Sequence, residues 1–156
     1  GFTEFVTLPF IHTNAPVYLA GIARPGPPAR DTRAVPAMAR LLLHPHNTNI
    51  QTSWVKLGAQ GAAEMRRSGA NDLGGTLIIE SISYAAGNQH GQELAPAAME
   101  ALIARAGRVP AQRNTLYDAV PAERRARSFA AAPLSGIVLT PLRRRPAAAL
   151  AGANGA

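Results

Sequence analysis

Segments typical of β-strands alternate along this chain with segments typical of α-helices. Strand patterns rich in β-branched and aromatic residues are expected at 2–7, 49–55 and 70–79, and a helical pattern follows each of them. This order favours parallel β/α units, because a strand can return parallel to its neighbour only through a crossover connection. The chain is therefore expected to have an α/β fold with a parallel sheet.

The first helix is placed by its apolar spacing and its end signals. It is expected at about 32–43, with Asp31 as the N-cap. Pro36 is compatible only with the first turn or so of that helix, because proline lacks the N–H that later turns need. The apolar face of the helix is expected to hold Val35, Met38, Ala39 and Leu42.

The remaining elements are shorter. The pair Gly74-Gly75 is expected to break the third strand, since glycine weakens a strand interior. Further elements are helices at 59–67, near Leu77, from Pro96 to Gly107 and from Pro121 to about Phe129, and a last short strand at 112–117.

These units are too few for a closed fold. Three parallel β/α units cannot close a barrel, and an open sheet of three strands leaves both edges unpaired. A complete (β/α)8 barrel takes about 250 residues, whereas the chain has 156 and opens at Gly1 directly in a strand pattern. We therefore expect residues 1–130 to be an incomplete part of a barrel from a longer protein, and the low-complexity residues 131–156 to be a disordered tail.

Composition excludes several classes of protein. The chain has no cysteine, which rules out disulfides and any cysteine-bound zinc or iron–sulfur cluster within it. The net charge of +7 comes almost wholly from arginine, with Lys56 the only lysine, and a GC-rich coding sequence accounts for this as well as a nucleic-acid partner does. No apolar run approaches the roughly 18 residues of a membrane span, and no signal peptide is recognisable. We expect a cytoplasmic protein without nucleic-acid or membrane partners.

Polar side chains recur on the predicted strands, where a core built only for stability would hold apolar residues. In a β/α barrel the ligand site lies at the carboxyl ends of the strands, and buried polar groups need hydrogen-bond partners. A run of such groups therefore predicts a ligand pocket. Its candidate residues are Glu4 on the first strand, Gln51 and Ser53 on the second, Asn71 and Asp72 on the third, and Glu80 after it.

Each candidate also has a purely structural explanation. Glu4 could pair with an arginine inside the barrel, and Gln51 and Ser53 could hydrogen-bond each other across strands. Asp72 with Gly74-Gly75 could form a turn, and this phrase is no phosphate loop because no Lys-Ser/Thr follows it. The residues alone leave both interpretations open.

The sequence identifies neither a metal site nor a catalytic residue. The two histidines of His44-Pro45-His46 would need a third ligand from elsewhere, and a histidine at a helix C-terminus more often complements the helix dipole. Ser53, His90 and Asp118 carry no local signature of a catalytic triad.

Four phrases together resemble a known family. They are GFTEFVTLPF (1–10), HPHNTNIQTSWVKLG (44–58), GANDLGGTLIIESIS (69–83) and QRNTLY (112–117). In this order they resemble the C-terminal part of FO synthases, within the half that condenses tyrosine with 5-amino-6-(D-ribitylamino)uracil during synthesis of the deazaflavin coenzyme F-420. The resemblance covers residues 1–129.

The resemblance implies about the last three β/α units of a radical S-adenosylmethionine (SAM) barrel of TIM type. In such enzymes an upstream cysteine triad holds a 4Fe-4S cluster, and SAM is cleaved to a radical that starts the transfer of the 4-hydroxybenzyl group from tyrosine. Because this chain has no cysteine, the fragment alone is expected to be inactive. Its implied partners are the two substrates, the rest of its own barrel and, where it is fused, the other FO synthase half.

The resemblance also implies roles for individual residues. Leu8, Pro9 and Phe10 would lie near the adenosine of SAM. Asp72 and Glu80 would receive the ammonium group of tyrosine. The side chains implied to line the substrate cavity are Gln51, Ser53, Asn71 and Asp72.

Two alternatives stay open at this point. A menaquinone-pathway radical SAM enzyme, similar to aminofutalosine synthase, shares the fold and similar phrases. A non-catalytic basic binding module is the alternative from another class. It predicts a chain that folds cooperatively alone and binds a polyanion, whereas the barrel interpretation predicts exposed strand edges.

Overall fold

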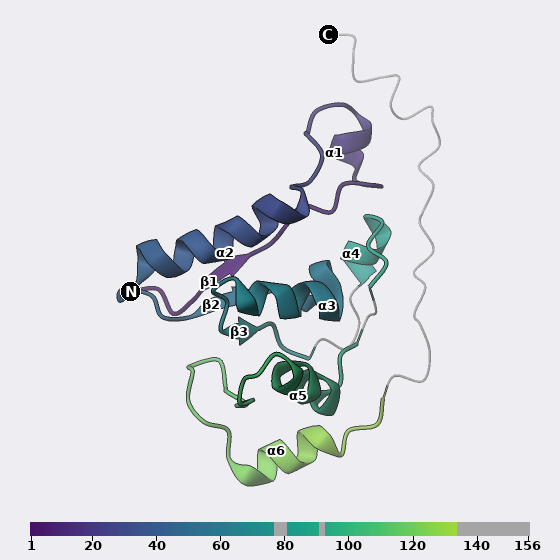
Figure 1. Cartoon of the computed structure of the whole chain (residues 1–156). Helices are drawn as coiled ribbons and strands as arrows, with labels where there is room; N and C mark the ends of the chain where they lie inside the picture. The colour runs from purple at the N-terminus through teal and green to yellow at the C-terminus, as the bar shows by residue number, and fades with distance from the viewer. Residues whose placement is uncertain (77–80, 91–92, 134–156) are drawn as a thin grey trace.

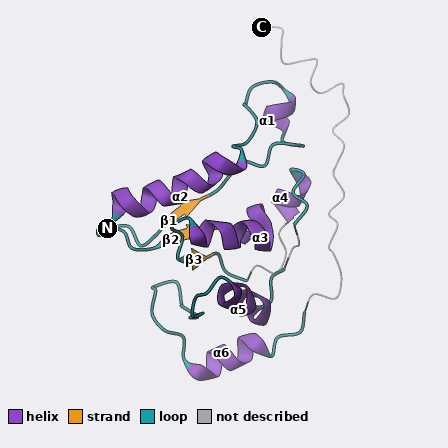
Figure 2. Cartoon of the chain, in the orientation of Figure 1, coloured by secondary structure: helices purple, strands orange, loops and turns teal. Residues whose placement is uncertain are grey.

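The computed structural model shows a parallel three-stranded sheet with helices packed against one of its faces (Figure 1, Figure 2). The structure describes residues 1–76, 81–90 and 93–133. Strands β1 (Phe5–Thr7), β2 (Ile50–Thr52) and β3 (Asp72–Leu73) lie in the order β1-β2-β3, and both neighbouring pairs are parallel. The predicted α/β class and parallel pairing are confirmed.

Helices connect and flank these strands (Figure 1). The helices of the described residues are α1 (Pro16–Leu19), α2 (Ala29–Leu43), α3 (Trp54–Arg67), α4 (Ser81–Ala85), α5 (Pro96–Arg105) and α6 (Ala122–Phe129). The crossover from β1 to β2 contains α1 and α2, and the crossover from β2 to β3 contains α3, as expected of parallel β/α units.

Helix α2 begins earlier than predicted. Pro28 is its N-cap, and Asp31 lies inside the first turn. Pro36 lies in the middle of the helix and is fully buried, which contradicts the expectation that it belongs to the first turn. A proline there leaves one helical hydrogen bond unmade, so packing against the sheet outweighs that loss.

The predicted apolar face of α2 is correct only for Ala39. The residues of α2 that are buried are Thr32, Pro36 and Ala39. Arg33 pairs with Glu64 of α3, and Arg40 donates to the Gly69 carbonyl, so polar contacts fix how the helix is rotated. Successive residues are about 100° apart around a helix, so the flank of α2 opposite Arg33 and Arg40 lies away from α3. That flank carries Val35, Met38 and Leu42, which are exposed.

The second strand is shorter than predicted. It ends at Thr52, and Trp54 and Val55 begin α3 instead of continuing the strand. Trp54 is buried, and its Nε1 donates to the Gly75 carbonyl at 3.0 Å. Tertiary packing of the indole therefore overrides the β propensity of this segment. A kink at Gly58, whose φ is 69°, separates this first turn from the helix predicted at 59–67.

The C-terminal elements agree with the sequence except at one place. Gly74-Gly75 ends β3 as predicted, α5 begins at Pro96, and α6 begins directly after Pro121. The predicted strand at 112–117 is wrong, because the segment is a loop with a single bridge between Arg113 and Ala119. The helix expected near Leu77 and most of the predicted tail, residues 134–156, lie outside the described residues.

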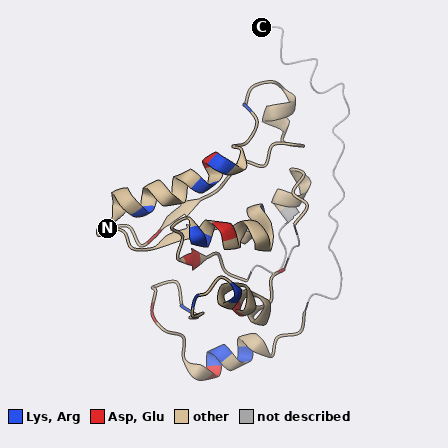
Figure 3. Cartoon of the chain, in the orientation of Figure 1, with Lys and Arg blue, Asp and Glu red and all other residues tan. Residues whose placement is uncertain are grey.

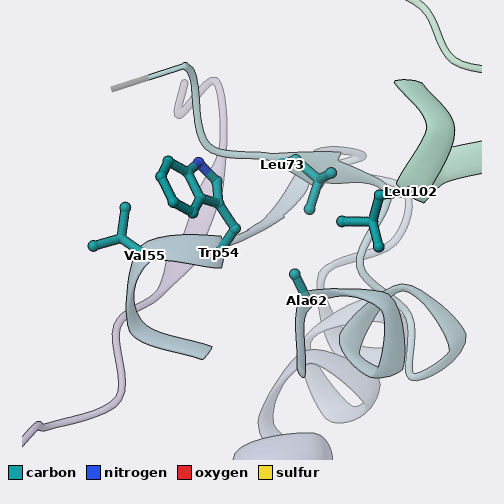
Figure 4. Close-up of a cluster of buried hydrophobic side chains, with 5 residues drawn as sticks. All are labelled: Trp54, Val55, Ala62, Leu73 and Leu102. Atoms are coloured by element: carbon teal, nitrogen blue, oxygen red, sulfur yellow. The ribbon is translucent and has the colours of Figure 1, made fainter. Parts of the chain in front are cut away.

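The core lies between the helices and one face of the sheet. One cluster joins α3, β3 and α5, where Leu73 lies beside Leu102 (Figure 4). A second cluster joins α2, β2 and α3 through Ala39, Ile50 and Met65, with Phe5 of β1 packed against it. Phe5, Ile50 and Leu73 therefore face the helices, and the opposite sheet face is left for other groups.

Truncation of Ile50 tests this placement of the core. Ile50 has 0% exposure, so Ile50→Ala should lower the free energy of unfolding, measured by urea denaturation. The expected loss is roughly 2 to 5 kcal/mol. Leu41→Ala, on a helix side chain with 74% exposure, is the control, and its expected change is within about 0.5 kcal/mol. Equal losses for the two variants would contradict the assignment.

Candidate functional site

The sheet face turned away from the helices carries the predicted polar residues. Val6, Gln51 and Asp72 are register partners across the three strands, so their side chains share one face. Glu4 precedes Val6 by two residues and points the same way. We call the face with Glu4, Val6, Gln51 and Asp72 the open face.

Gln51 links the two acidic residues of the open face. Its Nε2 donates to Glu4 Oε2 and to Asp72 Oδ2, each at 2.9 Å. Both amide hydrogens are used, so the orientation of the amide is fixed. Glu4 lies one residue before β1 and Asp72 is the first residue of β3, so the three meet on the sheet face and not at the carboxyl ends of the strands.

Two residues from the loop after α5 complete this group. Arg113 donates through Nε to Asp72 Oδ1 at 3.0 Å and through Nη2 to Asp72 Oδ2, and its Nη2 lies 3.4 Å from Glu4 Oε2. The Tyr117 hydroxyl lies 2.5 Å from Glu4 Oε2 and 3.1 Å from Asp72 Oδ2. The guanidinium stacks over the Tyr117 ring at 4.0 Å. We call Glu4, Gln51, Asp72, Arg113 and Tyr117 the carboxylate cluster.

Asn114 folds the loop that presents these two side chains. Its Oδ1 accepts from the backbone N–H of Leu116 at 2.8 Å and of Asp118 at 3.0 Å, and its own N–H donates to the Asp118 carbonyl. Tyr117 adopts a left-handed φ of 68°, which is unusual for a tyrosine. The side chain of one asparagine thus replaces the strand pairing that the sequence predicted.

The cluster controls the protonation of its donors. Burial, the hydrogen bond to Glu4 and the charge of Asp72 raise the pKa of the Tyr117 phenol above its ordinary value. The hydrogen bond to Asp72 raises the pKa of Arg113. Tyr117 therefore stays a neutral donor and Arg113 a cation. With both carboxylates ionised, the formal charge of the cluster is two negative charges against one positive, or −1.

The hydrogen-bonding capacity that remains lies mainly in acceptor oxygens. Gln51 and Tyr117 have no donor left, whereas Glu4 Oε1 and Gln51 Oε1 accept no hydrogen bond from the part of the chain that the structure describes. A Cβ added to Gly74 would lie 3.6 Å from Gln51 Oε1. That oxygen therefore faces the carboxyl end of β3, where a ligand of a β/α unit is expected.

Asn71 and Ser53, also predicted to bind substrate, make no hydrogen bond to the carboxylate cluster. Asn71 Oδ1 accepts from the Ile50 N–H at 2.8 Å and from Arg40 at 2.6 Å, which ties β2 to the start of β3. Ser53 is the N-cap residue of α3, but its side chain makes no capping hydrogen bond. Glu80 lies outside the described residues.

The segment predicted to contact SAM lies beside a separate cavity. Pro9 and Phe10 line a cavity of about 530 Å³ between α2 and α3, together with Lys56, Asn88 and His90. Leu8 is exposed. Asp72 and Arg113 line another cavity, of about 300 Å³, near α5. The structure does not join the Pro9–Phe10 segment and the cluster in one cavity.

The described residues show neither a metal centre nor a membrane-spanning helix. In the described ranges 1–76, 81–90 and 93–133, no three His, Cys, Asp or Glu side chains gather closely enough to hold a metal ion. None of the helices in those ranges is both long and apolar enough to span a bilayer.

The parallel β/α arrangement with a charged open face defines the class of the chain as a small α/β unit. Comparison with known families then identifies it: the chain belongs to the family described as the CofH/MqnC C-terminal region, which matches residues 1–126. This is the C-terminal region of radical SAM enzymes, and the resemblance found in the sequence is confirmed. All five residues of the carboxylate cluster lie within the matched range.

The most similar relatives include FO synthases. The FO synthase of Streptomyces avermitilis is 69% identical over 124 residues, covering 80% of this chain and 14% of that protein. The FO synthase of Mycobacterium tuberculosis H37Rv is 56% identical over 117 residues, covering 75% of this chain and 14% of that protein. The chain thus spans about a seventh of the length of these relatives.

A shorter relative carries a more specific name. It is the 5-amino-6-(D-ribitylamino)uracil–L-tyrosine 4-hydroxyphenyl transferase of Methanopyrus kandleri, 51% identical over 120 residues, with 77% of this chain and 32% of that protein covered. No solved structure matches the chain.

The raised pKa of Tyr117 predicts how stability responds to alkaline pH. An unfolded tyrosine ionises near pH ~10, whereas the folded Tyr117 holds its proton longer. The stabilisation from this proton is complete below pH ~10 and is lost as pH rises further. The stability difference between the protein and Tyr117→Phe should therefore be constant at neutral pH and shrink in alkali.

Two measurements check this. Denaturant unfolding at several pH values follows the stability difference directly. In a pH titration followed by tyrosinate absorbance, the last of the three tyrosine ionisation steps should be missing in Tyr117→Phe. A variant that keeps the last ionisation step would contradict the assignment to Tyr117.

Proposed function

We propose that this chain supplies the last three β/α units of the TIM-type barrel of a radical SAM transferase. The complete enzyme would join the 4-hydroxybenzyl group of tyrosine to 5-amino-6-(D-ribitylamino)uracil. The observation that carries the proposal is the 69% identity to an FO synthase over 124 residues. The family match over residues 1–126 includes the whole carboxylate cluster. The name of the Methanopyrus relative gives both substrates.

The unpartnered surfaces of the unit support an incomplete barrel. Among the described residues, β1 and β3 each pair on one side only, so each leaves a free strand edge. The exposed flank of α2, with Val35, Met38 and Leu42, lies on the side away from α3. A preceding β/α unit would pair with β1 and cover this flank, since bare edges and apolar faces are unfavourable in a stable protein.

The residues of this chain fit the expected cofactors only in part. A 4Fe-4S cluster does not fit, because the chain has no cysteine, so its ligands belong to the rest of the enzyme. SAM fits apolar and backbone contacts at Leu8, Pro9 and Phe10 after β1, where two of the three line a cavity. When bound, these groups supply the radical that removes a hydrogen atom from tyrosine.

The carboxylate cluster is suited to a ligand that is rich in donors. Its free acceptors, Glu4 Oε1 and Gln51 Oε1, together with the negative formal charge, favour an ammonium group. Tyrosine presents such a group. Fixing it by hydrogen bonds would hold the reacting atoms in place, which is what a radical reaction requires from its binding site.

The same chemistry separates the proposal from the menaquinone alternative. An enolpyruvyl benzoate carries two carboxylates, which bring acceptors and negative charge. The cluster offers acceptors and negative charge as well, so it would repel this substrate. The cluster therefore favours the tyrosine reaction.

A basic binding module has little support in the structure. Among the described residues, Lys and Arg are distributed over α2, α3, α5 and α6 (Figure 3), with three arginines, Arg124, Arg125 and Arg127, on α6. Arg33 already pairs with Glu64, and Arg125 pairs with Glu100 at 2.6 Å. A surface for polyanions would instead present a continuous group of unpaired cations.

A chimeric enzyme tests the proposal. Residues 1–126 of this chain replace the matching region of the Streptomyces avermitilis FO synthase, a relative that is 69% identical over 124 residues. The chimera should form product from tyrosine and the diaminouracil at a rate within about tenfold of the parent, a barrier difference of about 1.4 kcal/mol. It should form none from an enolpyruvyl benzoate. A folded chimera that turns over only the benzoate would overturn the proposal.

A pair of glycine variants tests the ligand-facing acceptor in the chimera. Gly74→Ala places a methyl group at ordinary contact distance, 3.6 Å, over Gln51 Oε1, so the sheet should accept it while the acceptor is covered. The tyrosine KM should rise roughly tenfold, the loss of about one charge-assisted hydrogen bond. Gly75→Ala is the control, since no described atom lies within 4 Å of its added Cβ. Equal effects of the two variants on the tyrosine KM would contradict the assignment of Gln51 to the binding site.

A further inference from the structure

We propose that Arg113 and Tyr117 are positioning residues of the tyrosine site, which act by holding Glu4 and Asp72 around Gln51. This inference rests on the proposed function and deepens it. Neither residue was among the candidates from the sequence. The structure places both side chains on the open face instead.

The first argument is the close approach of two like charges. Glu4 Oε2 and Asp72 Oδ2 share the same three donors, which are Gln51 Nε2, the Tyr117 hydroxyl and Arg113 Nη2. Two carboxylates held this close repel each other unless a cation lies between them. Arg113 is the cation that contacts both, so the geometry of the pair depends on it.

The second argument is the geometry of the guanidinium. Arg113 binds both oxygens of Asp72, through Nε and Nη2, which fixes the plane of the carboxylate. The Tyr117 ring stacks on the guanidinium at 4.0 Å and limits its movement. Arg113 Nη1 donates to the Asn114 carbonyl at 3.1 Å, which anchors the side chain to its own loop.

The third argument is which atoms are left for a ligand. Arg113, Tyr117 and Gln51 all bind Glu4 through Oε2. Glu4 Oε1 is thereby turned away from the cluster, and Gln51 Oε1 is turned toward Gly74. Without the two loop residues, only Gln51 would hold Glu4 through Oε2.

Partial burial makes these contacts stronger than surface ion pairs. The side chains of Asp72, Arg113 and Glu4 are 15%, 26% and 33% exposed. Charge pairs that are mostly removed from water interact more strongly than exposed pairs, and loss of one partner leaves the other uncompensated. Removal of Arg113 should therefore rearrange the two carboxylates.

The experiment uses the active chimeric full-length enzyme with Arg113→Met, Arg113→Lys and Tyr117→Phe. Arg125→Met is a matched control, since Arg125 also pairs with a carboxylate, Glu100 at 2.6 Å, and stacks on a ring, Phe129 at 4.4 Å. The readouts are tyrosine affinity by calorimetry without reductant, the KM values for tyrosine and for SAM, kcat, and the unfolding temperature.

Arg113→Met should weaken tyrosine binding by roughly tenfold or more, as expected when a charged site loses its geometry, and leave the KM for SAM unchanged. Arg113→Lys keeps the charge but loses the two-point contact, so its loss should be intermediate. Tyr117→Phe should give a smaller loss, and Arg125→Met none. In the double variant Asp72→Asn with Arg113→Met, the two losses should not add, because both act through one carboxylate.

Several outcomes would overturn the inference. One is equal tyrosine affinity in Arg113→Met and Arg125→Met, and another is additive losses in the double variant. A third is a loss of tyrosine and SAM binding together with a lower unfolding temperature, which would mark a purely structural role. If Arg113→Met does not fold, Arg113→Lys and Tyr117→Phe decide by the same measure. If the parent chimera converts tyrosine and the diaminouracil to product while these variants behave like Arg125→Met, only this inference is refuted. A folded chimera that does not bind tyrosine refutes the proposed function as well.

Discussion

The register of the parallel sheet is the constraint on which the rest of the site depends. Gln51 is paired with Asp72 on one side and Val6 on the other, so its amide lies between Glu4 and Asp72. A slip of one residue would turn Gln51 into the core and bring Ile50 to the open face. Asn71 secures this register, because its Oδ1 accepts from the Ile50 N–H while Arg40 of α2 binds the same oxygen. A residue predicted to bind substrate thus fixes the strand alignment that places the carboxylate cluster.

Much of the fold could be predicted from local pattern, and the errors share one cause. Alternating strand and helix signals, the glycines at 74 and 75 and the prolines at 96 and 121 correctly predicted the order of β1, α2, β2, α3, β3, α5 and α6. Periodicity failed where a tertiary contact decides. The indole of Trp54 bonds to the Gly75 carbonyl and draws the chain into a helix. Polar contacts of Arg33 and Arg40 rotate α2 so that Pro36 is buried, which no single-helix pattern indicates.

The candidate site was predictable on the strands and not in the loop. Glu4, Gln51 and Asp72 could be selected because a polar residue on a strand needs a partner and a strand has only two faces. Arg113 and Tyr117 lie in a loop, where no period assigns a direction, and Asn114 sets their direction through hydrogen bonds within the loop. Charge balance was the usable signal, because two neighbouring carboxylates require a cation. Glu4 does pair with an arginine, as its purely structural explanation proposed, although the sequence did not identify Arg113 as the partner.

The position of Arg113 and Tyr117 in the chain links completion of the carboxylate cluster to folding. Both residues follow α5, whereas Glu4 precedes β1, so the contact between Tyr117 and Glu4 spans 113 positions of sequence. The order of events follows from this separation. The sheet can pair its strands as soon as β3 is present, but the acceptors of the open face stay unaligned until the loop after α5 binds them. The carboxylate cluster is therefore complete only in a chain that has folded through the loop after α5.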